Sequence, residues 1–94
     1  MRYSVVIPAF NAAETIEETL CSVLAQTVRP QEVIVVDDGS TDATGEMARR
    51  FGGIVRVVRQ DNAGVGRATT VGLLAAQNPL VATLDADDLW LPHK

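Results

Sequence analysis

Apolar residues along the chain fall into short runs separated by longer segments with helical periodicity. The runs cover residues 4–7, 33–36, 54–58 and 80–84, and Arg56 interrupts the third. Short apolar runs without alternation, as in 4–7 and 33–36, are typical of strands that are buried on both faces. The segments between them are too long for hairpins and place apolar residues at helical spacing. The pattern therefore predicts an α/β fold, with a mainly parallel sheet of about four strands flanked by helices on both faces.

The first helical segment, residues 12–26, shows this periodicity and its expected boundary. Its inward face carries Ile16, Leu20, Val23 and Leu24. Asn11, followed three residues later by Glu14, is predicted to be an N-cap with a capping-box partner. Cys21 is the only cysteine, so it cannot form an internal disulfide, and we expect it to be a small buried thiol of this helix.

Residues with candidate chemistry follow each predicted strand. They are Phe10 and Asn11, Asp37 and Asp38, Asn62, and Asp85, Asp87 and Asp88. The carboxyl ends of parallel strands meet at one edge of a sheet, and ligands of open α/β sheets bind outside that edge. We therefore expect these loops to gather around one site.

The aspartates themselves indicate a bound cation. Carboxylates close to one edge would repel one another, and a divalent ion would remove that repulsion. Asp85 and Asp87 form an Asp-x-Asp pair whose two hard oxygen ligands suit Mg²⁺ or Mn²⁺ better than zinc. Such ions complete their shell with water and substrate phosphates. Aspartate is also a common turn residue, so the chemistry alone indicates only a domain that binds a nucleotide or phosphate ligand.

Charge and hydropathy exclude some classes of partner and indicate where the protein is located. The formal net charge is −4 and the arginines are scattered, so nucleic acid is not an expected partner. No apolar run approaches the roughly 20 residues that cross a bilayer. The first residues lead into a strand pattern instead of a signal peptide. We therefore predict a cytoplasmic location, with any attachment to the inner face of a membrane coming through segments outside residues 1–94.

Motifs with a fixed order and spacing span nearly the whole chain. They are Ser4-Val5-Val6-Ile7-Pro8-Ala9-Phe10-Asn11, Val35-Val36-Asp37-Asp38-Gly39-Ser40-Thr41-Asp42, Asn62-Ala63-Gly64, and Asp85-Ala86-Asp87-Asp88 with Trp90 and Pro92. Together they resemble the N-terminal part of family 2 glycosyltransferases, which have the GT-A fold, a Rossmann-like arrangement. The resemblance implies that residues 1–94 form the nucleotide-sugar-binding half of a glycosyltransferase domain, truncated at its C-terminus.

The resemblance also implies a pocket for the nucleobase of the donor. Pro8 and Phe10 would line this pocket, with Phe10 packing on the ring. Asp38 would accept a hydrogen bond from the base, as a carboxylate facing the imide N–H of a uracil can do. Asn62, at the start of the third motif, belongs to the same set of donor-binding residues. A UDP-sugar is therefore the favoured donor.

On the phosphate side, the resemblance places Asp85 near the ribose and the metal, with Asp87 as the direct metal ligand. The chain departs from the family where an Ala-Arg-Asn triplet is usual, because it has Ala68-Thr69-Thr70. The basic side chain expected near the diphosphate is missing at Thr69. Arg67 is a further candidate for the donor site, but it lies about 200° round a helix from Thr69 and cannot simply replace it.

The implied activity is transfer of a sugar from a nucleotide-diphosphate donor to an acceptor hydroxyl, usually with inversion. The catalytic base would lie beyond Lys94, so residues 1–94 alone are expected to be inactive and to self-associate through exposed apolar surface. The alternative is a non-catalytic nucleotide-binding or interaction module derived from the same fold. A dinucleotide-binding domain is disfavoured, because residues 8–11 supply no glycine-rich loop after the first strand.

Overall fold

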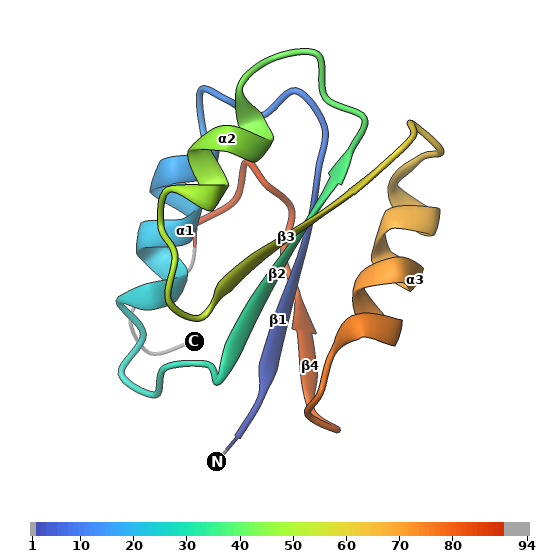
Figure 1. The fold of residues 1–94 in the computed structure, drawn as a ribbon. Helices are drawn as coiled ribbons and strands as arrows, with labels where there is room; N and C mark the ends of the chain where they lie inside the picture. The colour runs from blue at the N-terminus through green and yellow to red at the C-terminus, as the bar shows by residue number, and fades with distance from the viewer. Residues whose placement is uncertain (1, 90–94) are drawn as a thin grey trace.

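Parallel strands form the centre of the structure, a computed structural model that describes residues 2–89. The sheet contains β1 (Ser4–Ala9), β2 (Glu32–Asp38), β3 (Val55–Gln60) and β4 (Val81–Thr83), in the spatial order β3-β2-β1-β4. The helices are α1 (Ile16–Leu24), α2 (Thr44–Arg49) and α3 (Val65–Ala75). Helices α1 and α2 cover one face of the sheet and α3 covers the other (Figure 1). The predicted element order and parallel sheet are confirmed.

Alternation along the central strands divides the core into two parts. Every residue of β1 and β2 is buried, which explains why their sequences are continuous apolar runs. Val33 and Val35 pack in the cluster that contains residues of α1, whereas Ile34 and Val36 pack with Ala68 of α3. Successive side chains of a strand point to opposite faces. Asp37 is therefore on the face covered by α1 and α2, and Asp38 is on the face covered by α3.

Helix α3 packs directly against the sheet at Gly72. A Cβ atom at this position would come within 2.2 Å of Cγ1 of Val6 and 3.2 Å of Cγ2 of Val36. Both valines are fully buried in the centre of the sheet, so neither can move aside without disturbing the core. Glycine at this position therefore sets the separation between helix and sheet.

A hydrogen-bond network ties β2 to the connection between α3 and β4 at the amino ends of the strands. Glu32 accepts hydrogen bonds from Ser4 Oγ (2.8 Å), the N–H of Gln77 (2.5 Å) and Arg56 Nη2 (3.2 Å). Arg56 also donates to the carbonyl of Ala75 (3.1 Å). Burial by itself raises the pKa of Glu32, but the donors Gln77, Ser4 and Arg56 together hold it below its usual value. We call these residues the amino-end network.

Two expectations about the first helix are wrong. Helix α1 begins at Ile16, and its N-cap residue, Thr15, makes no side-chain capping bond, so Asn11 and Glu14 do not form a capping box. Cys21 is exposed instead of buried. At 100° per residue it lies about 140° round the helix from Ile16, away from the inward face.

Some expectations fall outside the described residues. Trp90 and Pro92, which belong to the fourth motif, are among them. Within residues 2–89, none of the helices combines the length and apolar character that a membrane span requires.

Candidate functional site

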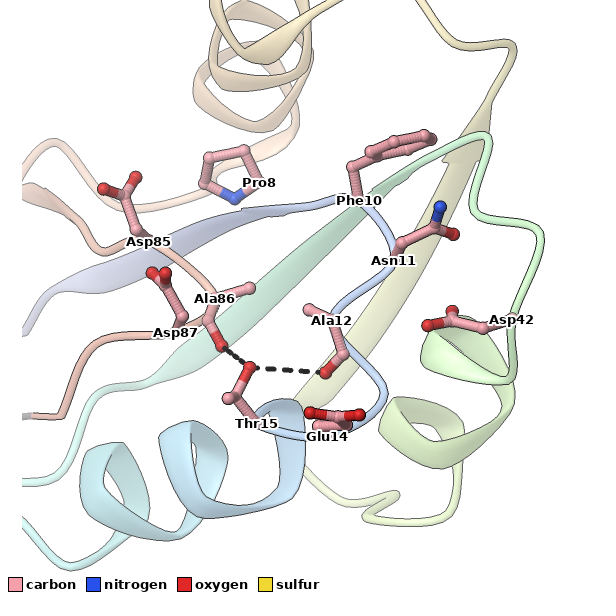
Figure 2. Close-up of a pocket in the computed structure, with 10 residues that line it drawn as sticks. All are labelled: Pro8, Phe10, Asn11, Ala12, Glu14, Thr15, Asp42, Asp85, Ala86 and Asp87. Atoms are coloured by element: carbon pink, nitrogen blue, oxygen red, sulfur yellow. Dashed lines mark hydrogen bonds between the residues drawn. The ribbon is translucent and has the colours of Figure 1, made fainter.

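A cavity at the carboxyl ends of the strands opens between the loops that follow β1 and β4. Its volume is about 540 Å³. It is lined by Pro8, Phe10, Asn11, Ala12, Glu14, Thr15, Asp42, Asp85, Ala86 and Asp87. Asp85 and Asp87 lie on one side of this cavity, and Asp42 lies on the other (Figure 2). The loops after β1, β2 and β4 meet at this cavity, as predicted, whereas Asn62 of the loop after β3 does not line it.

A smaller cavity lies on the face of the sheet that α3 covers. Its volume is about 120 Å³, and its lining includes Pro8, Phe10 and Asp38 together with Val65 and Ala68 of α3. The three residues predicted to hold a nucleobase are therefore adjacent. Phe10 lines both cavities and is 51% exposed, so its ring is part of the site and not of the core.

The carboxylate of Asp38 holds the loop between β3 and α3. Oδ1 accepts hydrogen bonds from Gln60 Nε2 and from the N–H of Ala63, both at 2.8 Å. Oδ2 accepts from the N–H of Gly64 at 3.0 Å and from Asn62 Nδ2 at 3.4 Å. The bond from Gln60 is the main reason that the pKa of Asp38 is below its usual value; burial opposes it, and the N–H groups of Ala63 and Gly64 lower it further.

The neighbouring Asp37 is fully buried on the opposite face and holds a different loop. Its Oδ1 accepts the N–H of Ser40 at 3.0 Å, and its Oδ2 accepts Arg59 Nη1 at 2.8 Å. Arg59 reaches this carboxylate from β3, and its Nη2 donates to the carbonyl of Ser40 at 3.0 Å. We call Asp37, Ser40 and Arg59 the carboxyl-end network.

The loop after β1 rests on the loop after β2. The N–H of Asn11 donates to Ser40 Oγ at 2.9 Å, and Asn11 Oδ1 accepts the N–H of Thr41 at 2.8 Å. Asn11 has a φ of 49°, in the left-handed region that asparagine tolerates better than most residues. Its side chain is thus used between loops, which explains why it does not cap α1.

Gly39 allows the loop after β2 to approach the loop after β3. Its φ is 71°, and a Cβ atom here would lie 2.6 Å from the backbone nitrogen of Asn62. Both the backbone angle and the close approach require glycine. The side chain of Asn62 then donates to the carbonyl of Asp38 at 3.0 Å.

The loop after β4 presents a group of carboxylates that fits a divalent cation. Asp85, Asp87 and Asp88 are exposed, and each offers a carboxylate oxygen within 4.8 Å of the others. Carboxylate oxygens with access to water match the preference of Mg²⁺ and Mn²⁺ for hard ligands and retained water. The donor set therefore fits the predicted cofactor, and Asp88 is an addition to the predicted pair.

Helix α1 holds the backbone of this acidic loop through two threonines that the sequence reasoning did not identify. Thr15 Oγ1 donates to the carbonyl of Ala86 at 2.9 Å (Figure 2). The hydroxyl of Thr19, which is fully buried, lies 2.8 Å from the same carbonyl and 2.9 Å from the carbonyl of Asp88. Thr15 and Thr19 are four residues apart, so both hydroxyls lie on the same side of the helix, near the inward residue Leu20. Two hydroxyls on the inward side of a helix are the signal that could have identified them.

The remaining predicted residue, Arg67, is less closely associated with the site. It is exposed on the first turn of α3 and is not among the residues that line either cavity. Thr69, which replaces the usual arginine of the third motif, donates its hydroxyl to the carbonyl of Val65 within the same helix at 2.8 Å. That hydroxyl is therefore used within α3.

Comparison with known proteins identifies the family. The model of the family described as Glycosyl transferase family 2 matches residues 4–94. The chain belongs to this family. An uncharacterized glycosyltransferase of Nostoc sp. is 40% identical over 98 residues, which cover all of this chain and 30% of that protein. The glycosyltransferase GlyA of Streptococcus pneumoniae is 33% identical over 93 residues, covering 96% of this chain and 13% of that protein.

Solved structures of glycosyltransferases share the fold. Residues 1–349 of TarS from Staphylococcus aureus, in complex with UDP-GlcNAc, superpose with a TM-score of 0.87 at 33% identity, covering 95% of this chain and 27% of that one. The mannosyltransferase PcManGT of Pyrobaculum calidifontis, in complex with GDP-Man and Mn²⁺, gives a TM-score of 0.86 at 33% identity, covering 94% and 28%. These similarities confirm the predicted GT-A fold. The chain spans less than a third of the length of each of these relatives.

Proposed function

We propose that this chain forms the donor-binding half of an inverting glycosyltransferase that uses a nucleoside-diphosphate sugar, with a UDP-sugar preferred. The observation that carries the proposal is the placement of two complementary sites at one edge of the sheet. Pro8, Phe10 and Asp38 surround a small cavity, and a cluster of carboxylates lies beside the larger cavity next to it. The TarS and PcManGT structures, obtained with UDP-GlcNAc and with GDP-Man and Mn²⁺, support this class of ligand.

In the proposed complex, the nucleobase packs against the exposed ring of Phe10. Asp38 receives the imide N–H of the base on Oδ2. The contact from Asn62 to that oxygen is 3.4 Å, the longest of the bonds to this carboxylate, so it is the one that the base N–H replaces at least cost. The main-chain donors of Ala63 and Gly64 stay in place and keep the carboxylate oriented and ionised.

Asp87 would be the direct ligand of Mg²⁺ or Mn²⁺, and Asp85 would lie near the ribose and the metal. The ion supplies neutralisation of the charge that develops on the diphosphate leaving group. Thr15 and Thr19 keep the backbone of this loop in place through Ala86. An acceptor hydroxyl attacks the anomeric carbon, and its proton passes to a carboxylate base that we place beyond Lys94. Arg67, exposed on the first turn of α3, is the candidate cation for a contact with the diphosphate.

A calorimetric titration of UDP into the protein, with and without Mn²⁺, tests the proposal. We expect binding that requires Mn²⁺ and that is lost in Asp87→Ala. Asp61→Ala is the matched control, because Asp61 is also exposed and lines neither cavity, and the substitution removes the same charge. Loss of binding in both variants would show that the effect comes from the change in net charge and not from a metal ligand. Absence of UDP binding to the folded wild-type protein would favour the non-catalytic module.

A further inference from the structure

We propose that Arg59, which lines neither cavity, is a positioning residue of the nucleotide site. The proposal rests on the proposed function, and it starts from the buried carboxylate of Asp37. Within residues 2–89, the described ion pairs give this carboxylate one cationic partner, Arg59, at 2.8 Å. An ionised carboxylate without solvent is held in place only if its oxygens receive donors. Arg59 and the N–H of Ser40 supply them.

The geometry of Arg59 fixes the start of the loop after β2 from two sides. One nitrogen of the guanidinium binds Asp37, and the other binds the carbonyl of Ser40 at 3.0 Å. Ser40 therefore has its N–H bound by Asp37 and its carbonyl bound by Arg59. A planar guanidinium presents such paired donors in a rigid arrangement, whereas a lysine ammonium is a single flexible point charge.

Ser40 transmits this constraint to the wall of both cavities. Its Oγ accepts the N–H of Asn11, and the next residue, Thr41, donates its N–H to the Asn11 side chain. These two bonds hold Asn11 at a φ of 49°, a conformation that a residue other than glycine adopts only when its surroundings stabilise it. Phe10 is the residue directly before Asn11, so the angle at Asn11 decides where the chain turns after the aromatic ring.

Arg56, on the same strand, offers a matched control. It too bridges a carboxylate of β2 and a backbone carbonyl, those of Glu32 and Ala75, and its exposure is close to that of Arg59, 47% against 52%. Within residues 2–89, the contacts of its network lie at the amino ends of the strands and include neither Phe10 nor Asn11. A general loss of stability is expected for substitution of either arginine, whereas a loss of loop positioning is expected for Arg59 alone.

The test compares Arg59→Lys with Arg56→Lys in the whole protein, using two readouts. The first is the dissociation constant for UDP in the presence of Mg²⁺, measured by calorimetry. We expect Arg59→Lys to weaken binding about tenfold, which corresponds to the loss of one charge-assisted hydrogen bond, and Arg56→Lys to leave it unchanged. The second is the three-bond coupling between the amide and α protons of Asn11, which reports φ at that residue without any nucleotide.

Ser40→Ala provides a second variant that leaves the bonds of Arg59 to Asp37 and to the Ser40 carbonyl in place. It should weaken UDP binding and change the Asn11 coupling in the same direction, and combining it with Arg59→Lys should add little. Equal effects of the two lysine variants, or an Asn11 coupling that does not change in Arg59→Lys, would overturn the positioning role. Failure of the wild-type protein to bind UDP would overturn the proposed function instead, and the coupling would still decide the role of Arg59.

Discussion

Two arginines of β3, three residues apart, make the same two kinds of contact, one with a carboxylate of β2 and one with a backbone carbonyl, toward opposite ends of the sheet. Arg56 joins Glu32 to the carbonyl of Ala75, and Arg59 joins Asp37 to the carbonyl of Ser40. The first network ties strand β2 to the connection between α3 and β4. The second network ties β2 to loops that line the cavities. The two networks differ because one lies at the amino ends of the parallel strands and the other at their carboxyl ends.

The lesson is that chemistry alone does not separate a structural carboxylate from a functional one. Glu32, Asp37 and Asp38 are all buried, and all accept several hydrogen bonds. Their positions differ: Glu32 begins β2, whereas Asp37 and Asp38 end it. In a parallel sheet only the carboxyl ends meet the loops where ligands bind. Variants at the two ends should therefore separate stability from binding.

The largest expected difference is between Asp38→Ala and Glu32→Ala. Each variant leaves main-chain or side-chain donors without an acceptor, so each should lower the free energy of unfolding by about 2 kcal/mol. Asp38→Ala should also abolish binding of UDP, because it removes the acceptor for the base and releases the loop at Ala63 and Gly64. Glu32→Ala should bind UDP as the wild type does. Denaturant titration and calorimetry measure the two effects, and weaker UDP binding in Glu32→Ala would remove the distinction between the two ends.

A smaller effect is expected for Thr19→Val, which keeps the shape of a fully buried side chain and removes its hydroxyl. The carbonyls of Ala86 and Asp88 lose a donor, so the acidic loop is held less firmly. We expect about tenfold weaker binding of Mn²⁺, measured by electron paramagnetic resonance of the free ion.

Thr70→Val is the control for this substitution. The hydroxyl of Thr70 binds the carbonyl of Gly66 within α3, so this variant should bind Mn²⁺ normally. Equal affinities of the Thr19 variant and the wild type would show that helix α1 does not position the acidic loop.

The smallest expected effect is on the stability of the protein at acidic pH. Glu32 and Asp38 both have a pKa below the usual value in the folded protein. At a pH between the folded and unfolded pKa values the unfolded chain binds more protons, so stability falls as the pH falls. The contribution should be complete above about pH 6 and lost progressively below about pH 4, the region of the unfolded pKa values. Glu32→Gln should make this acid dependence shallower in denaturation experiments at several pH values, and an unchanged slope would contradict the assignment to Glu32.

The sheet could be predicted from the sequence because its determinants are local. The continuous apolar runs of β1 and β2 reflect burial on both faces, and the lengths of the connections require parallel pairing. The placement of Asp38 and Asp85 at one edge followed from this topology. The start of α1 could not be predicted in the same way. Asn11 has the chemistry of an N-cap, but its partners, Ser40 and Thr41, lie about thirty residues away.

The supporting side chains were missed for the same reason. In the sequence, Arg59 is one of several scattered arginines. Its pairing with Asp37 depends on the register of β2 and β3, which places the two residues side by side. Thr19 reads as part of a helix, and its partners Ala86 and Asp88 come from the loop after β4. The exposure of Cys21, by contrast, was available from helical geometry, since its angle from Ile16 directs it away from the core.

The donor site is tested most directly by a map of amide chemical shifts as UDP and Mg²⁺ are added to the isotopically labelled protein. We expect changes at Phe10 and Asn11, at Asp38, and at the loops that contain Gly64 and Asp87, with little change at Glu32 and Gln77. Changes concentrated around the amino-end network, or none at any position, would contradict a donor site at the carboxyl ends of the strands.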